Sequence, residues 1–136
     1  MGVLFICVIL RFALARRDAA LLDTYSSEKE IDLKRDRDLS ALDLQLEQLN
    51  GALKNATQRF NDTKARADAL ENNKKPMPPA LKDELARATS DKQRLEKAVE
   101  AKQKEKETIR LQFAEQKKRY AELRSAQAPT AAATKK

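Results

Sequence analysis

The clearest pattern in the chain is a repeat of apolar positions at alternating spacings of three and four residues, starting at Leu39. This spacing places the side chains on one stripe of a helix, and a stripe kept over several heptads is typical of a coiled coil. Asn50-Gly51 lies within the repeat without shifting its phase, so we expect the helix to continue through the glycine. The stripe consists of Leu39, Leu42, Leu46, Leu49, Leu53, Ala56, Phe60, Thr63, Ala67 and Leu70.

A second stripe follows a cluster of prolines. Residues 72–79 read Asn-Asn-Lys-Lys-Pro-Met-Pro-Pro. We expect an asparagine to end the first helix in the left-handed conformation, and Pro79 to lie in the first turn of the next helix. The second stripe consists of Leu81, Leu85, Ala88, Lys92, Leu95, Val99, Lys102, Lys106, Ile109, Phe113, Gln116, Tyr120 and Leu123.

Two stripes of similar length, joined by a short turn, can bury each other if the chain folds back on itself. The pattern therefore predicts an all-α fold, a long antiparallel two-helix coiled-coil hairpin over residues 16–126. The first arm covers about 27–73, the turn 74–79 and the second arm about 80–125. A parallel dimer of straight rods is disfavoured because the prolines interrupt the helix.

Centring the turn near Met77 predicts which side chains meet across the hairpin. Leu42 is expected between Ile109 and Phe113, and Leu33 is expected near Tyr120. At the start of the first arm, Ser27-Glu28-Lys29-Glu30 has the spacing of a capping box, in which hydroxyl and carboxylate each satisfy a free amide of the other residue.

The chain ends are expected to differ from the hairpin. Residues 127–136 have no apolar period and are expected to form a disordered tail.

Residues 1–15 form an apolar segment resembling a signal or an anchor. Its apolar stretch is shorter than the roughly 20 residues of a spanning helix. It is interpreted as a marginal anchor, a signal-peptide core or a truncated version of something longer. Arg16 and Arg17 follow it and favour a cytoplasmic C-terminal side for an anchor, whereas a cleaved signal implies export.

The composition argues against an enzyme. The 136 residues contain no histidine, no tryptophan and one cysteine, Cys7, so the commonest general base and a cysteine-rich metal site are both missing. Charged residues make up 36% and aromatic residues 4%, which is typical of exposed helices with a thin core. We expect no catalytic residues, no metal and no cofactor.

The net charge of +7 lies mainly in the second half of the chain. Residues 16–73 contain 10 Lys/Arg and 12 Asp/Glu, whereas residues 74–136 contain 17 and 9. Two interpretations stay open: an acidic arm beside a basic arm, or a basic face for phosphate or anionic lipid. The candidate interaction residues are Lys102, Lys106, Arg110, Lys117, Lys118 and Arg119.

Lys102 and Lys106 occupy stripe positions where apolar residues are expected. Either their alkyl stems pack in the seam while the ammonium groups reach toward Glu47 and Asp43, or they form a polar notch that fixes the register or receives an acidic group of a partner.

The stretch from Arg16 to Arg37, the stripe from Leu39 to Leu53, the Lys74–Pro79 turn and Arg119-Tyr-Ala-Glu-Leu also carry a resemblance. Together they resemble the C-terminal coiled-coil tail of uncharacterised proteobacterial envelope proteins that have a small β-rich N-terminal domain of unknown function. This chain has an apolar run in place of that domain. The resemblance implies an envelope location and brings no catalytic residues.

The sequence is therefore compatible with three functions. The first is a non-enzymatic structural or protein-interaction module of the bacterial cell envelope, membrane-associated through residues 2–15 or periplasmic, which binds a protein partner or itself as a four-helix homodimer. The alternative is a basic hairpin that binds nucleic acid, similar in shape to the tRNA-binding arm of seryl-tRNA synthetases, with a cytoplasmic location. A third is a rod resembling a phage spanin.

Overall fold

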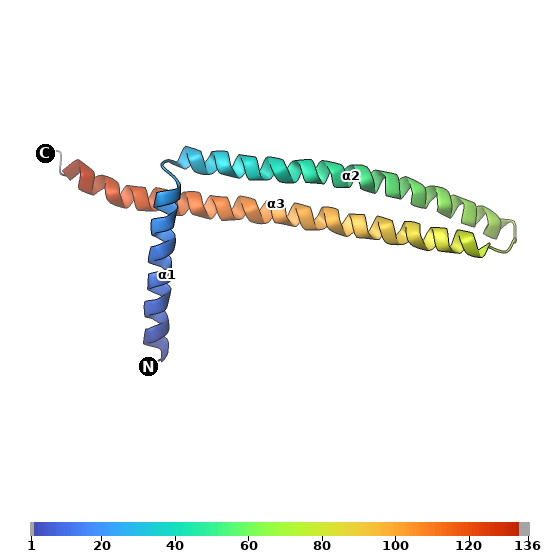
Figure 1. The fold of residues 1–136 in the computed structure, drawn as a ribbon, viewed down its shortest axis with the longest axis horizontal. Coiled ribbons are helices and arrows are strands. Elements are labelled where there is room, and N and C mark those ends of the chain that lie inside the picture. Colours follow the sequence, from blue (N-terminus) through green and yellow to red (C-terminus); the bar gives the residue numbers. More distant parts are fainter. Residues whose placement is uncertain (1, 134–136) are drawn as a thin grey trace. The chain divides into compact units, whose positions relative to one another are not determined.

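The computed structural model describes residues 2–133, with side chains described as far as Gln127, and helices make up nearly all of this part of the chain. Three helices follow one another: α1 (Gly2–Thr24), α2 (Glu28–Asn72) and α3 (Pro79–Ala133) (Figure 1). None of the described residues lies in a β-strand. The predicted all-α class is confirmed, but the region before the first predicted arm forms a complete third helix.

Helix α1 contains both the apolar segment up to residue 15 and the polar residues that begin at Arg16. Both belong to one helix that continues to Thr24. Alanine, leucine and arginine favour the helix, and neither glycine nor proline interrupts the segment after Gly2. Across the described helices, none is both long enough and apolar enough to traverse a lipid bilayer.

The start of α2 is capped nearly as predicted. The Glu30 amide donates to the Ser27 hydroxyl oxygen at 3.4 Å. The Glu30 carboxylate, however, accepts hydrogen bonds from Ser26, at 2.9 Å from its amide and 2.7 Å from its hydroxyl group. The predicted reciprocal bond to the Ser27 amide is therefore wrong by one residue. Ser26 has both an amide and a hydroxyl group to offer, so it binds both carboxylate oxygens.

The end of α2 corrects the predicted role of asparagine. Lys74, and not Asn72 or Asn73, has the left-handed conformation, with φ of 55°. The Lys75 amide donates to the Leu70 carbonyl at 2.9 Å, and the Lys74 amide donates to the Glu71 carbonyl at 3.0 Å. This pair of bonds defines a Schellman motif with Lys74 at the residue after the cap. The hydrogen bonds of the motif determine which residue is left-handed. The residue types in this stretch did not predict it.

The start of α3 agrees with the prediction for Pro79. The amides of Leu81 and Lys82 both donate to the carbonyl of Pro78, at 3.1 and 3.2 Å. Pro79 is the first helical residue, where its missing amide costs nothing because that amide would have no partner in the helix.

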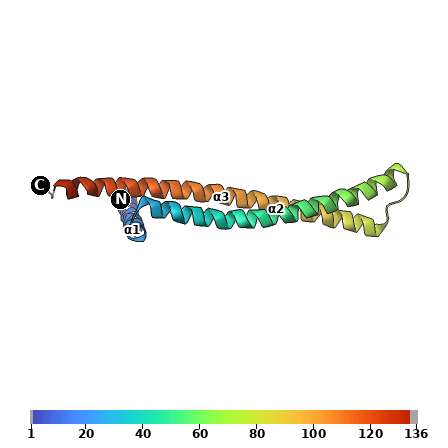
Figure 2. The ribbon, with the colours of Figure 1, turned by 90° about the horizontal axis from the view of Figure 1, so that it is seen from above.

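Residue contacts divide the chain into two compact units. The turn unit comprises Ser40–Glu107, in which the end of α2 and the start of α3 lie side by side on either side of the chain reversal (Figures 1 and 2). The Arg66 guanidinium group pairs with the Glu84 carboxylate near the reversal. The buried side chains of this unit are Leu42, Leu46, Ala56, Thr63, Ala67, Leu81, Ala88, Leu95 and Val99.

The joint unit comprises Met1–Leu39 together with Thr108–Lys136. Its apolar core contains two tyrosines, Tyr25 and Tyr120, packed with Ile31 and Phe113. Half-buried Leu21, Leu22 and Ile109 pack against this core. The core therefore joins the end of α1 to both other helices.

All residues of the two predicted stripes are buried or half-buried. The predicted position of Leu33 near Tyr120 is wrong, because Leu33 is 50% exposed and Ile31 is the residue that packs with Tyr120. Counting back from Leu39 in steps of four and three gives Arg35 and Asp32, so Ile31 lies beside the stripe on α2, whereas Leu33 lies farther from it.

Helix α3 also extends beyond residue 126, where the sequence predicted the end of regular structure. Of the predicted tail at 127–136, residues 134–136 lie outside the described residues.

Candidate functional site

Three of the six predicted interaction residues on α3 form ion pairs with carboxylates of another helix. Lys106 pairs with Asp43 in the turn unit. In the joint unit, Lys117 pairs with Asp32 at 3.0 Å, and Arg119 pairs with Asp18. The carboxylates come from α1 and α2, so these cations compensate the acidic residues of the other helices.

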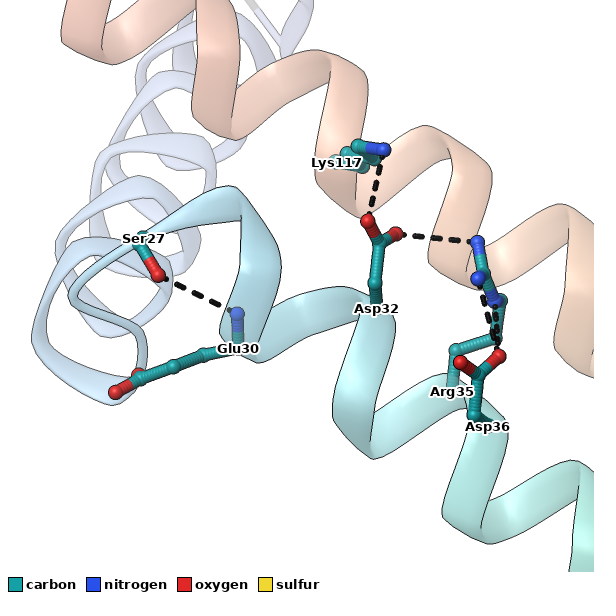
Figure 3. A network of polar contacts seen from close by, with 6 residues as sticks. All are labelled: Ser27, Glu30, Asp32, Arg35, Asp36 and Lys117. Atoms are coloured by element: carbon teal, nitrogen blue, oxygen red, sulfur yellow. Dashed lines mark hydrogen bonds and ion pairs between the residues drawn. The ribbon is translucent and has the colours of Figure 1, made fainter.

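Asp32 is the centre of a small polar network (Figure 3). One of its oxygens accepts a hydrogen bond from Lys117 of α3, and the other accepts one from Arg35, a turn later on α2, at 3.1 Å. The same Arg35 reaches Asp36 at 3.0 Å. Two cations therefore share two carboxylates, and about a third of the Asp32 and Arg35 side chains is exposed to water.

The Asp18–Arg119 pair has a two-point geometry. Arg119 Nε donates to Asp18 Oδ1 at 3.0 Å, and Nη2 donates to Oδ2 at 2.7 Å. Nη1 of the same guanidinium group donates to Glu122 at 3.1 Å. The hydrogen bonds from Arg119 lower the pKa of Asp18, and the carboxylates of Asp18 and Glu122 raise the pKa of Arg119. Because such a planar pair fixes direction as well as distance, it positions α1 against α3.

The other three predicted residues are Lys102, Arg110 and Lys118. Lys102 pairs with Glu105 of its own helix at 3.2 Å, so its predicted reach toward Glu47 is wrong. The predicted contact of Lys106 with Asp43 is confirmed. Arg110 and Lys118 are exposed. Lys102 and Lys106 belong to the turn unit, and the other four residues belong to the joint unit.

Tyr120 organises the joint unit, a role that the sequence pattern did not predict. Its side chain is 2% exposed, and its hydroxyl oxygen accepts a hydrogen bond from Arg124 Nε at 2.9 Å. Arg124 also donates to the Ser26 carbonyl in the link between α1 and α2, at 3.0 Å. The sequence did offer one indication of this role: Tyr120 is a stripe residue of α3, and the predicted register placed it beside the start of α2.

An open groove of about 740 Å³ lies between α1 and α3 in the joint unit. Leu14, Arg17 and Asp18 contribute to one side, and Gln112 and Gln116 contribute to the other. Gln116 Oε1 is buried and has no hydrogen-bond partner among the described residues. The groove is lined by both charged and apolar groups.

The described residues contain no group of three or more Asp, Glu, His or Cys side chains that could hold a metal ion. The chain's one cysteine, Cys7, is exposed on α1.

Comparisons with protein-family models, curated proteins and solved structures found no match to this chain.

Proposed function

We propose that this chain is a non-enzymatic structural or protein-interaction module of the bacterial cell envelope, built on an antiparallel coiled-coil hairpin of α2 and α3. The observation that carries the proposal is the burial of both stripes together with the direction of the ion pairs. In the turn unit, Arg66 pairs with Glu84 close to the reversal, whereas Asp43 pairs with Lys106 far from it. Pairs in this order join helices that run in opposite directions.

The packing of the turn unit supports a hairpin that stabilises itself. Small buried residues, Ala56, Ala67 and Ala88, allow two helices to approach closely. Thr63 is 1% exposed, and its hydroxyl group donates to the Arg59 carbonyl at 2.8 Å, so its polar group is satisfied within α2.

The charges favour an interaction between helices over one with nucleic acid. Lys106, Lys117 and Arg119 are already paired with carboxylates, so each would have to exchange a protein partner for a phosphate. The buried aromatic residues Phe113 and Tyr120 belong to the core of the joint unit and offer no free face for stacking. A nucleic-acid function would also require affinity that falls steeply with salt concentration.

A second copy of the chain is the partner that the exposed side chains support best. Leu44 is 63% exposed in the turn unit, and Leu111 is 60% exposed in the joint unit. Further helices packed against these leucines would remove their apolar surface from water. A second copy could supply those helices and form the four-helix assembly.

Thermal unfolding followed by circular dichroism over a wide range of protein concentration tests the hairpin. Pairing within one chain gives a melting temperature that does not depend on concentration, and self-association of hairpins adds only a shallow rise. Complete loss of helix on dilution would contradict the proposal, because it would mean that the helices pair only between chains. Fractionation of the producing cells tests the location: recovery of the chain only with freely soluble cytosolic proteins would exclude the envelope.

A further inference from the structure

The N-terminal part of α1 exposes every large apolar side chain that it contains. Over residues 3–14, the exposed fractions of these side chains lie between 53% and 76%, and α1 has no buried residue. Apolar surface of this extent in one place marks a contact with another molecule or with a membrane. The residues concerned are Val3, Leu4, Phe5, Ile6, Val8, Ile9, Leu10, Phe12 and Leu14.

The apolar side chains surround the helix and do not form a stripe. Residues 3–10 are apolar without interruption, and successive side chains of a helix point about 100° apart. A groove or a partner helix covers one side of such a cylinder and leaves the rest in water. A helix that is apolar on all sides is instead found within a large protein core or among lipid chains.

The charges at the end of the apolar part favour lipid with anionic headgroups. Arg16 and Arg17 follow it directly, and Arg11 lies within it. The Arg16 guanidinium carbon lies 5.1 Å from the centroid of the Phe12 ring, so this cation is held beside the apolar surface. Cations next to an apolar segment are the complement of a phosphate layer above lipid chains.

The nearest acidic residue does not cancel this positive charge. Asp18 is the first carboxylate of the chain, and both of its oxygens accept hydrogen bonds from Arg119. That bidentate pair draws the Asp18 charge toward α3. A membrane that approaches the end of the apolar part therefore meets arginines whose nearest carboxylate is already paired.

We infer that residues 3–14 insert into an anionic phospholipid bilayer, with Arg16 and Arg17 at the headgroup phosphates. This inference rests on the proposed envelope function and names the surface to which the hairpin attaches. It concerns insertion of this segment and does not require that the helix traverse the bilayer. The contact between Asp18 and Arg119 then links the inserted helix to α3 within the joint unit.

The test uses the full chain labelled at Cys7 with an environment-sensitive fluorophore, because this single cysteine lies within the apolar part and is exposed. Labelled protein is mixed with vesicles of phosphatidylcholine containing phosphatidylglycerol, and separately with vesicles of phosphatidylcholine alone. We expect a blue shift of the emission and co-flotation with the anionic vesicles. Quenching by lipids that carry a quencher on the acyl chain is expected to show that position 7 lies among the chains.

Two sets of variants separate the apolar and the cationic contributions. Ile6→Asp with Ile9→Asp should abolish flotation, whereas Leu33→Asp, which changes an exposed leucine on α2, should leave it unchanged. Arg16→Gln with Arg17→Gln should weaken binding to the anionic vesicles by about 30-fold. Equal binding of the unaltered chain to both kinds of vesicle would overturn the requirement for anionic lipid.

Absence of flotation and of any spectral shift with either vesicle would overturn the inference as a whole. So would a shift that appears without lipid, depends on protein concentration and disappears in the Ile6→Asp, Ile9→Asp variant, because the segment would then bind a second copy. Concentration-independent unfolding of the same variants would show that the hairpin is intact. Failure of membrane insertion is therefore distinguishable from failure of the proposed coiled coil.

Discussion

Asp18 of α1 and Arg119 of α3 lie more than one hundred residues apart in sequence and meet in a two-point ion pair with contacts of 3.0 and 2.7 Å. The pair lowers the pKa of Asp18 below its ordinary value of 3.8. The carboxylate must be ionised for this contact. Its contribution to the stability of the joint unit is therefore fully present above the ordinary pKa of aspartate and is lost as the pH falls through the lowered value.

The Arg119→Gln variant tests this contact directly. It removes the largest cause of the shift, so the pKa of Asp18 should rise back toward its ordinary value. The side-chain carboxyl carbon of Asp18, followed by NMR during an acid titration, reports this change. Lys118→Gln is the matched control, since it removes an adjacent exposed cation and should leave the Asp18 titration where it is. An unchanged Asp18 pKa in the Arg119→Gln variant would exclude the two-point pair.

Ile31 and Leu33 provide a second test, because the sequence and the structure assign the core position to different residues. Ile31 is 1% exposed and Leu33 is 50% exposed. Ile31→Ala should lower the free energy of unfolding by about 3 kcal/mol, as expected for a buried aliphatic residue. Leu33→Ala should change it by less than about 0.5 kcal/mol. Urea unfolding measures both, and a larger loss for Leu33→Ala would restore the register predicted from the sequence.

Gly51 should be a position where stability can be gained. It lies within α2, its φ is not positive, and a methyl group added there would meet no atom within 4 Å. Gly51→Ala should raise the free energy of unfolding by about 1 kcal/mol, because alanine has less backbone freedom to lose. A decrease measured by urea unfolding would mean that the chain needs a flexible point at Asn50-Gly51.

Lys74 should also be improved by substitution. Its left-handed conformation, with φ of 55°, costs an L-residue energy that glycine avoids. Lys74→Gly should stabilise the turn unit by about 1 kcal/mol in urea unfolding. Lys75→Gly removes the same charge one residue later, where φ is not positive, and should give no such gain. Equal effects of the two variants would show that charge, and not conformation, determines the result.

The heptad pattern predicted the helical class and the buried stripes, because both depend on local spacing along one helix. Tyr120 and Phe113 were correctly placed in the seam for this reason. The pattern failed where the outcome depends on competition between neighbours, as with Ser26 against Ser27 for the Glu30 carboxylate, or Lys74 against the asparagines for the left-handed position. Such competition is decided by hydrogen-bond geometry, which residue types alone do not specify.

The candidate site was harder to predict than the fold. A count of charges identified a basic second half, but Lys117 and Arg119 turned out to pair with Asp32 and Asp18. The contact of Arg119 with Asp18 depends on where α1 packs, and α1 carries no stripe from which its partner could be deduced. Arg124, which joins Tyr120 to the Ser26 carbonyl, was missed because an arginine off the stripe looks like any solvated charge.

Packing of α2 and α3 in opposite directions within one chain can be measured as a distance between spin labels in the turn unit. In a Cys7→Ser background, labels at Gln48 and Ala101 lie five residues from the Asp43–Lys106 pair on the two helices. Packed helix axes are about 8–10 Å apart, so these labels should lie within about 25 Å of each other even when diluted with unlabelled chain. Labels at Gln48 and Lys82 should lie roughly 30 Å farther apart along the axis. A short Gln48–Lys82 distance, or a Gln48–Ala101 distance that disappears on dilution, would contradict antiparallel packing within the chain.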